Sequence, residues 1–251
     1  MITGFGRLRE LDDGTVRARV RMWPGEPTTA HLVLADHTMM VSASTLTEWT
    51  GRLVDAGYPL VRTGALSIES ARVFVEQGFH LIQDLVLMRR ALSRRDRFDA
   101  PGHLLRPLRS SRALTAAARI DQSAFAAPWH LDEVGITEAM HATPQHRIRL
   151  AVSATDDPAG YLVTGRNGTM GFIQRLAVDP AHEGQGVASS LLRDGLDWLA
   201  RRGVTEVLVN THVDNDRAFA LYHRHGFSFT GSNLVVLECP LGDRAAGDVA
   251  T

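Results

Sequence analysis

The sequence is poor in cysteine and has no lysine. Its 251 residues include a single cysteine, Cys239, so no disulfide can form within the chain. All 27 residues counted as Lys+Arg are arginine. A reducing, cytoplasmic setting is therefore expected, and the protein offers no lysine side chain of its own for modification.

The chain also has neither a large excess of one charge nor a long apolar run. The formal net charge is −1, which argues against the strongly basic surface of a nucleic-acid-binding protein. No apolar run approaches the ~18 residues that span a bilayer, and residues 1–9 lack the apolar core of a signal peptide. We therefore expect neither nucleic acid nor membrane as a partner. The 44% apolar and 22% charged residues are typical of a soluble globular protein.

The second half of the chain predicts alternating strands and helices. Strands are expected at residues 147–153, 160–165, 171–178, 206–212 and 233–239, and helices at 112–126, 131–140, 187–202 and 214–226. Asn167-Gly168 is typical of a hairpin turn. An antiparallel start followed by strands that alternate with helices favours a mixed α/β sheet.

The first half predicts a fainter version of the same order. Strands are expected at residues 15–22, 30–34, 59–63 and 80–88, and helices at 44–56 and 68–77. One helix ends at Gly78-Phe79, as a helix of the second half ends at Gly226-Phe227. The pattern favours a tandem duplication with a drifted first copy, while common helix-ending chemistry remains the alternative.

Between the halves lies an arginine-rich segment with Pro101, Gly102 and Pro107. It reads as a linker, or else as a surface loop within one domain. The expected organisation is a first domain at 1–92, a linker at 93–104, a second domain at 105–242 and a flexible tail at 243–251.

The first chemical motif is a glycine loop, residues 182–186, between a predicted strand and a predicted helix. This arrangement directs backbone N–H groups and the positive end of the helix dipole at one point, where a phosphate is the expected ligand. Gly184 and Gly186 lack Cβ atoms, which lets a ligand approach the backbone closely. A plain strand-to-helix turn is the alternative.

The second motif runs from Asn215 to Phe227. Asn215 is a suitable helix N-cap, and Tyr222 lies two helical turns later on the same face. Taken singly, the two residues are explained by capping and by core packing.

Together, the two motifs resemble the GNAT superfamily of acetyl-CoA-dependent N-acetyltransferases. Gly186 and Ala188 match the end of the pattern Arg/Gln-x-x-Gly-x-Gly/Ala, whereas Glu183 replaces its leading residue. The pattern Asn-x-x-Ala-x-x-x-Tyr-x-x-x-Gly-Phe is met in full from Asn215 to Phe227. The second half looks most like the ribosomal-protein alanine N-acetyltransferase branch, and the tandem arrangement is similar to mycothiol synthase. The resemblance implies a tandem GNAT-like α/β fold with a degenerate first copy and a complete second copy.

The resemblance also implies roles for individual residues. Tyr222 would act as general acid at the thioester sulfur, and the acceptor amine would attack the acetyl carbon directly, without a covalent enzyme intermediate. Asn215 would bind the pantetheine region of acetyl-CoA. The other coenzyme contacts would come from the strand at Leu176, Ala177 and Val178 and from the loop and helix start at Gly184, Gln185, Gly186, Val187, Ala188 and Ser189. No metal is expected, because His141 and His146 lack metal-ligand spacing.

The acceptor side of the site departs from the family. Asn210 stands where the alanine-acetyltransferase branch has a glutamate base, and Gln174 stands where some relatives have an acid. His212 lies two residues on, on the same strand face, and is either the base or a histidine that only lines the cleft. Without a carboxylate base, a low-pKa amine is the expected acceptor, either a protein N-terminus or a small-molecule amine.

Phe125 and Trp129 lie between the first two helices of the second half, where the family places acceptor contacts. They are expected to line the acceptor site or else to pack the helices together.

The first copy has no glycine loop. Residues 39–44 stand in its place, and the position aligned with Tyr222 falls near Phe74 or Val75. We expect this copy to bind no CoA. Two alternatives to an independent enzyme remain, namely a non-catalytic acyl-CoA-binding or regulatory module, and an enzyme active only with a partner protein.

Overall fold

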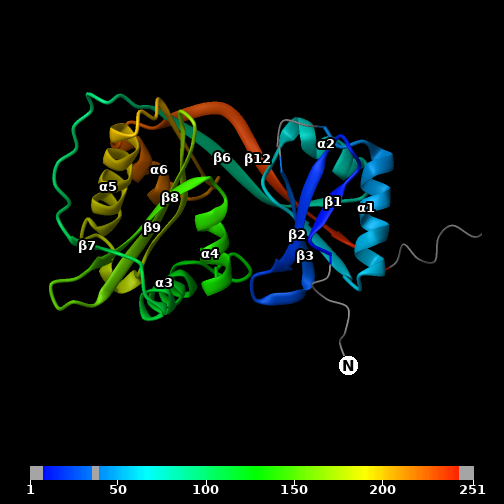
Figure 1. The fold of residues 1–251 in the computed structure, drawn as a ribbon, viewed down its shortest axis with the longest axis horizontal. Helices are drawn as coiled ribbons and strands as arrows, with labels where there is room; N and C mark the ends of the chain where they lie inside the picture. The colour runs from blue at the N-terminus through cyan, green and yellow to red at the C-terminus, as the bar shows by residue number, and fades with distance from the viewer. Residues whose placement is uncertain (1–7, 36–39, 243–251) are drawn as a thin grey trace, which may run out of the picture. The chain divides into compact units, whose positions relative to one another are not determined.

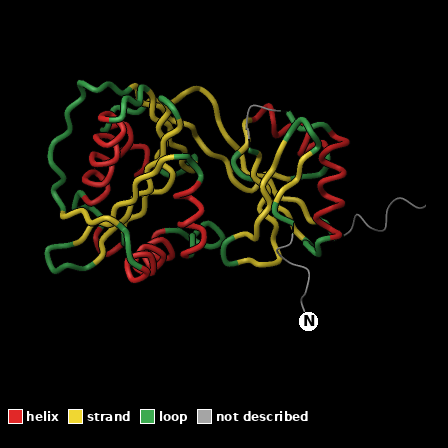
Figure 2. Tube along the Cα trace, viewed as in Figure 1, coloured by secondary structure: helices red, strands yellow, loops and turns green. Residues whose placement is uncertain are grey.

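The computed structural model describes residues 8–35 and 40–242. The expected tail at 243–251 and Met39 lie outside the described residues. The chain forms two compact units, each containing strands and helices (Figure 2). The first unit comprises residues up to Val86, His212–Asp214 and the chain from Gly231 onward, and the second comprises Leu87–Thr211 and Asn215–Thr230.

The first unit contains a sheet covered by two helices. Its elements are β1 (Glu10–Asp12), β2 (Arg17–Trp23), β3 (Glu26–Leu34), α1 (Ala43–Asp55), β4 (Leu60–Thr63), β5 (Leu66–Ser67) and α2 (Ile68–Glu76). Strands β1, β2 and β3 are antiparallel neighbours, and β4 runs parallel to β3. The expected helices at 44–56 and 68–77 are thus confirmed to within one residue, because their apolar faces repeat at helical spacing.

The second unit has the same kind of sheet between two pairs of helices (Figure 1). Its elements are β7 (Leu104–Pro107), α3 (Ser111–Ala124), α4 (Glu133–His141), β8 (Gln145–Val152), β9 (Pro158–Asn167), β10 (Met170–Val178), the short 3₁₀ helix η1 (Pro180–His182), α5 (Val187–Arg201), β11 (Glu206–His212) and α6 (Asp216–Arg224). Strands β7 to β10 are antiparallel neighbours, and β11 runs parallel to β10. The Asn167-Gly168 hairpin is confirmed, with Asn167 paired to Met170.

The order of elements repeats between the two units. In the first, β3, α1, β4 and α2 follow one another, with β3 and β4 parallel. In the second, β10, α5, β11 and α6 do the same, again with a parallel strand pair. The mixed α/β fold and its tandem arrangement are as the sequence predicts.

Two long strands are divided between the units. Strand β6 (His80–Ala91) begins in the first unit and ends in the second, whereas β12 (Ser228–Pro240) begins in the second and ends in the first. The end of β12 pairs with β4, Cys239 opposite Val61, and Leu237 joins the buried core of the first unit. The expected domain limits, 1–92 and 105–242, therefore differ from the compact units, because backbone pairing joins strands that are far apart in sequence.

The segment expected to be a linker, 93–104, is folded onto the second unit. Gly102 N donates to Ser190 Oγ on α5 at 3.1 Å, and His103 Nδ1 lies 3.1 Å from the same oxygen. Leu104 then begins β7, which pairs with β8. The end of this segment thus contacts α5 before β7 begins.

The helices of the second unit pack on opposite faces of its sheet. Tyr161 and Val163 face α3, where they join a cluster with Ala117. Leu162 and Thr164 face α5, which approaches closely because Gly195 has no side chain. A Cβ at Gly195 would lie 2.8 Å from both of these side chains. The alternation along β9 therefore fixes which helices cover which face. Among the described residues, no helix is long and apolar enough to cross a membrane.

Candidate active site

The site begins where two parallel strands separate. Strand β10 is paired with β11 from Met170 to Phe172, and the register ends at Phe172 opposite Leu208. Both strands continue beyond this point, to Val178 and to His212. On its other edge β10 stays paired with β9 as far as Val178 opposite Gly160. The edge of β10 that faced β11 is therefore left to accept an extended ligand as an added strand.

The glycine loop lies directly after this free edge. Gly184 and Gly186 have left-handed backbones, with φ of +72° and +82°. Gly186 is the N-cap of α5 and supplies no side-chain cap, and the first helical hydrogen bond runs from Ser190 N to Gly186 O. The N–H groups of the first turn, residues 187–189, therefore have no acceptor within the helix. This end of α5 is suited to bind an anion.

Two side-chain contacts hold α6 beside the glycine loop and the start of α5. Arg217 Nη1 lies 2.7 Å from Glu183 Oε2, and His225 Nε2 lies 3.2 Å from Ser189 Oγ. Asn215 caps α6, accepting from Ala218 N at 3.0 Å. The structure thus brings the two sequence motifs together, although Glu183 and Arg217 are 34 positions apart in the chain.

Among the ionisable side chains of α6, that of Tyr222 is buried, and 6% of the residue's surface is exposed. Its ring packs on Phe227, with centroids 5.5 Å apart. Burial raises the pKa of Tyr222 above its usual value of about 10, and the charge of Arg175 opposes this rise in part. The hydroxyl therefore keeps its proton at neutral pH.

Beside Tyr222 lies a buried polar network centred on Asp121. Its carboxylate, on α3, is fully buried. It accepts two hydrogen bonds from the guanidinium of Arg175 on β10, at 2.6 and 2.8 Å, and a third from the hydroxyl of Tyr161 on β9. Burial raises the pKa of Tyr161, and the charge of Asp121 raises it further, so this hydroxyl remains a donor. The network joins one helix and two strands of the second unit around the end of the free edge.

Comparison with known proteins identifies the family to which the chain belongs. A sequence profile described as "Acetyltransferase (GNAT) family" matches residues 114–227. The [ribosomal protein bS18]-alanine N-acetyltransferase of Escherichia coli is 31% identical over 117 residues, which are 46% of this chain and 74% of that protein. The chain belongs to the acetyltransferase (GNAT) family.

Another relative and a solved structure match a larger share of the chain. A mycothiol acetyltransferase of Actinosynnema mirum is 30% identical over 161 residues, covering 60% of this chain and 54% of that protein. The chain spans 38% and 54% of the length of the first two curated relatives it matches. A tandem GNAT protein from the clavulanic acid biosynthesis pathway shares the fold, with a TM-score of 0.66 and 16% identity over 91% of this chain and 79% of that one.

The two aromatic residues predicted to line the acceptor side of the GNAT site are both held by Arg175. The guanidinium lies over the Phe125 ring, with Cζ 3.6 Å from the ring centroid. Its Nη2 also donates to the backbone carbonyl of Trp129 at 2.8 Å. The Asp121 carboxylate also accepts a hydrogen bond from the backbone N–H of Leu131. The segment between α3 and α4 is therefore fixed to β10 through one ion pair.

The two amide side chains predicted at the acceptor side, those of Gln174 and Asn210, differ in burial. Gln174 stands at an irregularity in the pairing of β10 with β9, between Ile173 and Arg175. Its buried Oε1 has no hydrogen-bond partner among the described residues and lies against Gly165, where a Cβ would come within 2.5 Å of it. Asn210 is exposed on β11. Neither amide can take a proton at neutral pH.

His212, the predicted base, lies at the end of β11 in a segment that belongs to the first compact unit. Its side chain is 41% exposed and lies 3.7 Å from the carboxylate of Asp214. Asp214 N donates to its Nδ1 at 3.2 Å. In the neutral ring the proton is therefore on Nε2, and the nitrogen able to accept one is already in use.

Asp121, Arg175 and Tyr161 are the site residues that sequence reasoning missed. A signal was present, because Asp121 lies four residues after buried Ala117 on the apolar face of α3. A carboxylate on such a face requires a partner. The sequence does not say which of 27 arginines supplies it.

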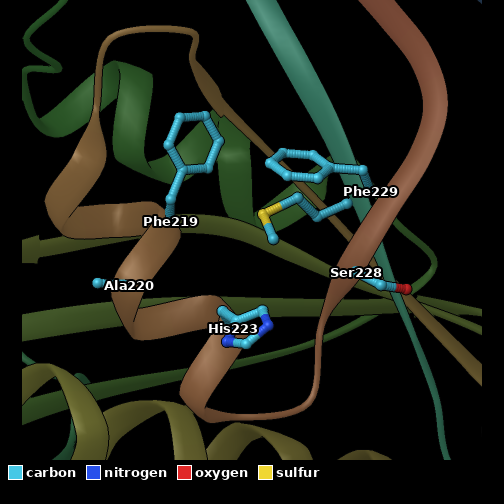
Figure 3. Close-up of a pocket in the computed structure, with 6 residues that line it drawn as sticks. Phe219, Ala220, His223, Ser228 and Phe229 are labelled. Carbon is cyan, nitrogen blue, oxygen red and sulfur yellow. The ribbon is translucent and has the colours of Figure 1, made fainter.

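An apolar pocket of about 440 Å³ lies elsewhere on α6. Phe219 and His223 of α6 face Phe229 of β12 across it (Figure 3). None of the predicted site residues lines it. Among the described residues no group of three or more His, Cys, Asp or Glu side chains is placed to hold a metal ion.

Proposed function

We propose that this chain transfers an acetyl group from acetyl-CoA to a primary amine by direct attack in a ternary complex. The observation that carries the proposal is the separation of β10 from β11 after Phe172, directly before the glycine loop. One continuous surface then offers an unpaired strand edge for the amide-containing pantetheine arm and an uncapped helix for the pyrophosphate.

In this proposal Leu176, Ala177 and Val178 hold the pantetheine arm through their backbone groups. The loop and first turn of α5, residues 184–189, hold the pyrophosphate through N–H groups. Asn215 uses its side-chain oxygen to cap α6, so its amide NH₂ is the part that remains for the coenzyme.

Tyr222 acts at the thioester sulfur. A thiol titrates near ~8.5, and the pKa of Tyr222 lies above its usual value of about 10, so complete proton transfer to the thiolate runs uphill. A hydrogen bond from the hydroxyl to the developing thiolate is therefore the larger contribution. The buried position of Tyr222 strengthens this bond, because water does not compete for the sulfur.

The acceptor in this proposal is an amine of low pKa. With Asn210 and Gln174 at the acceptor side, no carboxylate takes the proton, and His212 must first release Asp214 N to act as a base. A lysine amine, with a pKa near ~10.4, is almost wholly charged at pH 7, whereas an α-amine near ~7.7–8.0 is partly neutral. An α-amine also fits the relatives named for an alanine N-acetyltransferase of a ribosomal protein and for mycothiol acetylation.

The test measures release of free CoA thiol from acetyl-CoA by the full chain. Acceptors would be a peptide with a free N-terminus, the same peptide N-acetylated but containing one lysine, and an amino sugar. The proposal expects kcat/KM to be roughly 10-fold or more higher for the α-amine peptide than for the lysine peptide at pH 7.5. A clear preference for lysine contradicts the acceptor class but leaves the acetyltransferase activity standing.

A second candidate is a non-catalytic acyl-CoA-binding module, which the missing carboxylate base favours. It predicts that CoA binds but that no amine in the mixture accelerates thiol release, in the wild-type chain and in Tyr222→Phe alike. Turnover by the wild-type chain that falls in Tyr222→Phe excludes it.

The first copy is proposed to bind no CoA. The N-terminus of α1 is capped by Ser42, whose side chain accepts from Thr45 N, so the position equivalent to the uncapped end of α5 is occupied. Strand β4 also stays paired with β3 along its whole length, from Leu60 to Thr63. Among the described residues, this parallel pair therefore leaves no strand edge as long as that of β10 beyond Phe172, and the helix end is capped.

A further inference from the structure

An ion pair joins the glycine loop to the first turn of α6. Arg217 Nη1 lies 2.7 Å from Glu183 Oε2. Both side chains reach solvent, with 71% of the Arg217 side chain and 38% of the Glu183 side chain exposed. Glu183 stands three residues before Gly186, and Arg217 stands two residues after Asn215. The pair therefore links one residue from each of the two sequence motifs.

Helix stability does not account for Arg217. The first turn of a helix favours acidic side chains, and a cation there opposes the helix dipole. An ion pair as exposed as this one also adds little to folding. Asn215 and Asp216 already provide the cap and the acidic residue that this turn requires.

Glu183 is unfavourable for ligand binding. Its carboxylate lies at the mouth of a loop whose free N–H groups attract an anion, and a like charge at that point weakens phosphate binding. Arg217 removes this charge conflict in the free protein. An arginine fork has five N–H donors, so it can turn from a carboxylate to a phosphate, or contact both, without moving its helix.

We propose that Arg217 is the side-chain cation that binds the pyrophosphate of acetyl-CoA, and that Glu183 holds it at the loop and competes with the coenzyme for it. This inference rests on the proposed function, since it concerns the same coenzyme site. It assigns to a residue of the second motif the contact that the first motif lacks at position 183.

The experiment measures Kd for CoA and for dephospho-CoA by calorimetry on the full chain. The variants are Arg217→Gln and Glu183→Gln, and Arg201→Gln is the matched control. Arg201 is also an exposed arginine paired with an acid, Asp197, with 74% of its side chain exposed. It lies at the far end of α5, away from the glycine loop.

Arg217→Gln is expected to lower the affinity for CoA and for dephospho-CoA by a similar factor, roughly 5- to 30-fold, because both ligands contain the pyrophosphate. Glu183→Gln is expected to bind both ligands roughly 2- to 5-fold more tightly, because the competing charge is gone. Arg201→Gln should bind as the wild-type chain does. The loss in Arg217→Gln should shrink as salt is raised.

Three results overturn the inference. The first is unchanged affinity in Arg217→Gln, and the second is a loss seen with CoA but not with dephospho-CoA, which places the contact at the 3′-phosphate. The third is weaker binding by Glu183→Gln. Absence of CoA binding by the wild-type chain overturns the proposed function as well, and so the two failures are distinguishable. Because both side chains are exposed, melting temperatures are expected to stay near the wild-type value.

Discussion

Arg175 and Asp121 form a two-point ion pair in which the guanidinium donates from Nε and Nη2 to the two carboxylate oxygens of a fully buried aspartate. The same guanidinium covers Phe125 and binds the carbonyl of Trp129. One pair thus couples the strand that leads into the coenzyme loop with the segment proposed to meet the acceptor. Its loss is expected to affect both stability and the acceptor side.

Asp121→Asn is expected to cost about 3–5 kcal/mol of unfolding free energy, because it leaves Arg175 without its counter-charge in a buried place. Urea unfolding measures this. Asp194→Asn is the matched control, since Asp194 also binds an arginine, Arg147, at two points, but the side chains of that pair are 14% and 26% exposed. Its cost should be clearly smaller, and equal losses would show that burial does not set the energy.

Tyr222→Phe is expected to lower kcat by roughly 10²–10⁴, because the proton and hydrogen bond for the departing thiolate are removed. The ring and its contact with Phe227 are kept. The KM for acetyl-CoA and the melting temperature should therefore change little. Steady-state kinetics with an α-amine peptide make the measurement, and an unchanged kcat would rule the role out.

The raised pKa of Tyr222 predicts the shape of the pH profile. A tyrosine whose pKa is raised stays protonated to a higher pH than a free tyrosine, so its acid form persists through pH ~10. With an α-amine acceptor, kcat/KM should rise as the amine loses its proton near ~7.7–8.0 and then stay level to about pH 10. The contrary result is a fall in kcat/KM centred below pH 10. To contradict the prediction, this fall must disappear when Tyr222 is substituted and persist when the acceptor is changed.

Gly186→Ala separates backbone strain from ligand contact. An added Cβ at Gly186 meets no atom within 4 Å in the free protein, so only the φ of +82° is unfavourable. The loss of stability should be about 1–2 kcal/mol. Gly168→Ala, in the hairpin, has a φ of +56° and equally open surroundings, and it should cost a similar amount. CoA affinity should fall by roughly tenfold or more in Gly186→Ala alone. Equal affinities would remove the loop from the coenzyme site.

The division of β6 and β12 predicts how fragments behave. Residues 1–92 lack the part of β12 that pairs with β4, and residues 93–251 lack residues 87–92 of the second unit. Each fragment alone is expected to unfold without a cooperative transition, because a sheet edge and part of a core are missing. The two fragments, co-expressed, should purify together and melt cooperatively. A cooperative transition and CoA binding by 93–251 alone would contradict this prediction.

The sequence by itself determined the local features of this protein. Helical spacing placed α1, α2 and α5 to within one residue at each end and α6 to within two, and Asn167-Gly168 fixed the hairpin. The glycine loop and the motif from Asn215 to Phe227 indicated the GNAT family, to which the chain belongs. These features depend on neighbours within one or two turns, where propensity, capping and periodicity act directly.

Only the tertiary structure decided the long-range pairs. The partner of Asp121, the ion pair between Glu183 and Arg217, and the place of β12 beside β4 join residues that are 34 to 180 positions apart. Backbone hydrogen bonds between strands are the same for every sequence, and all 27 Lys+Arg residues here are arginine, so neither choice is written locally. Burial and packing of the complete chain select among the possible partners.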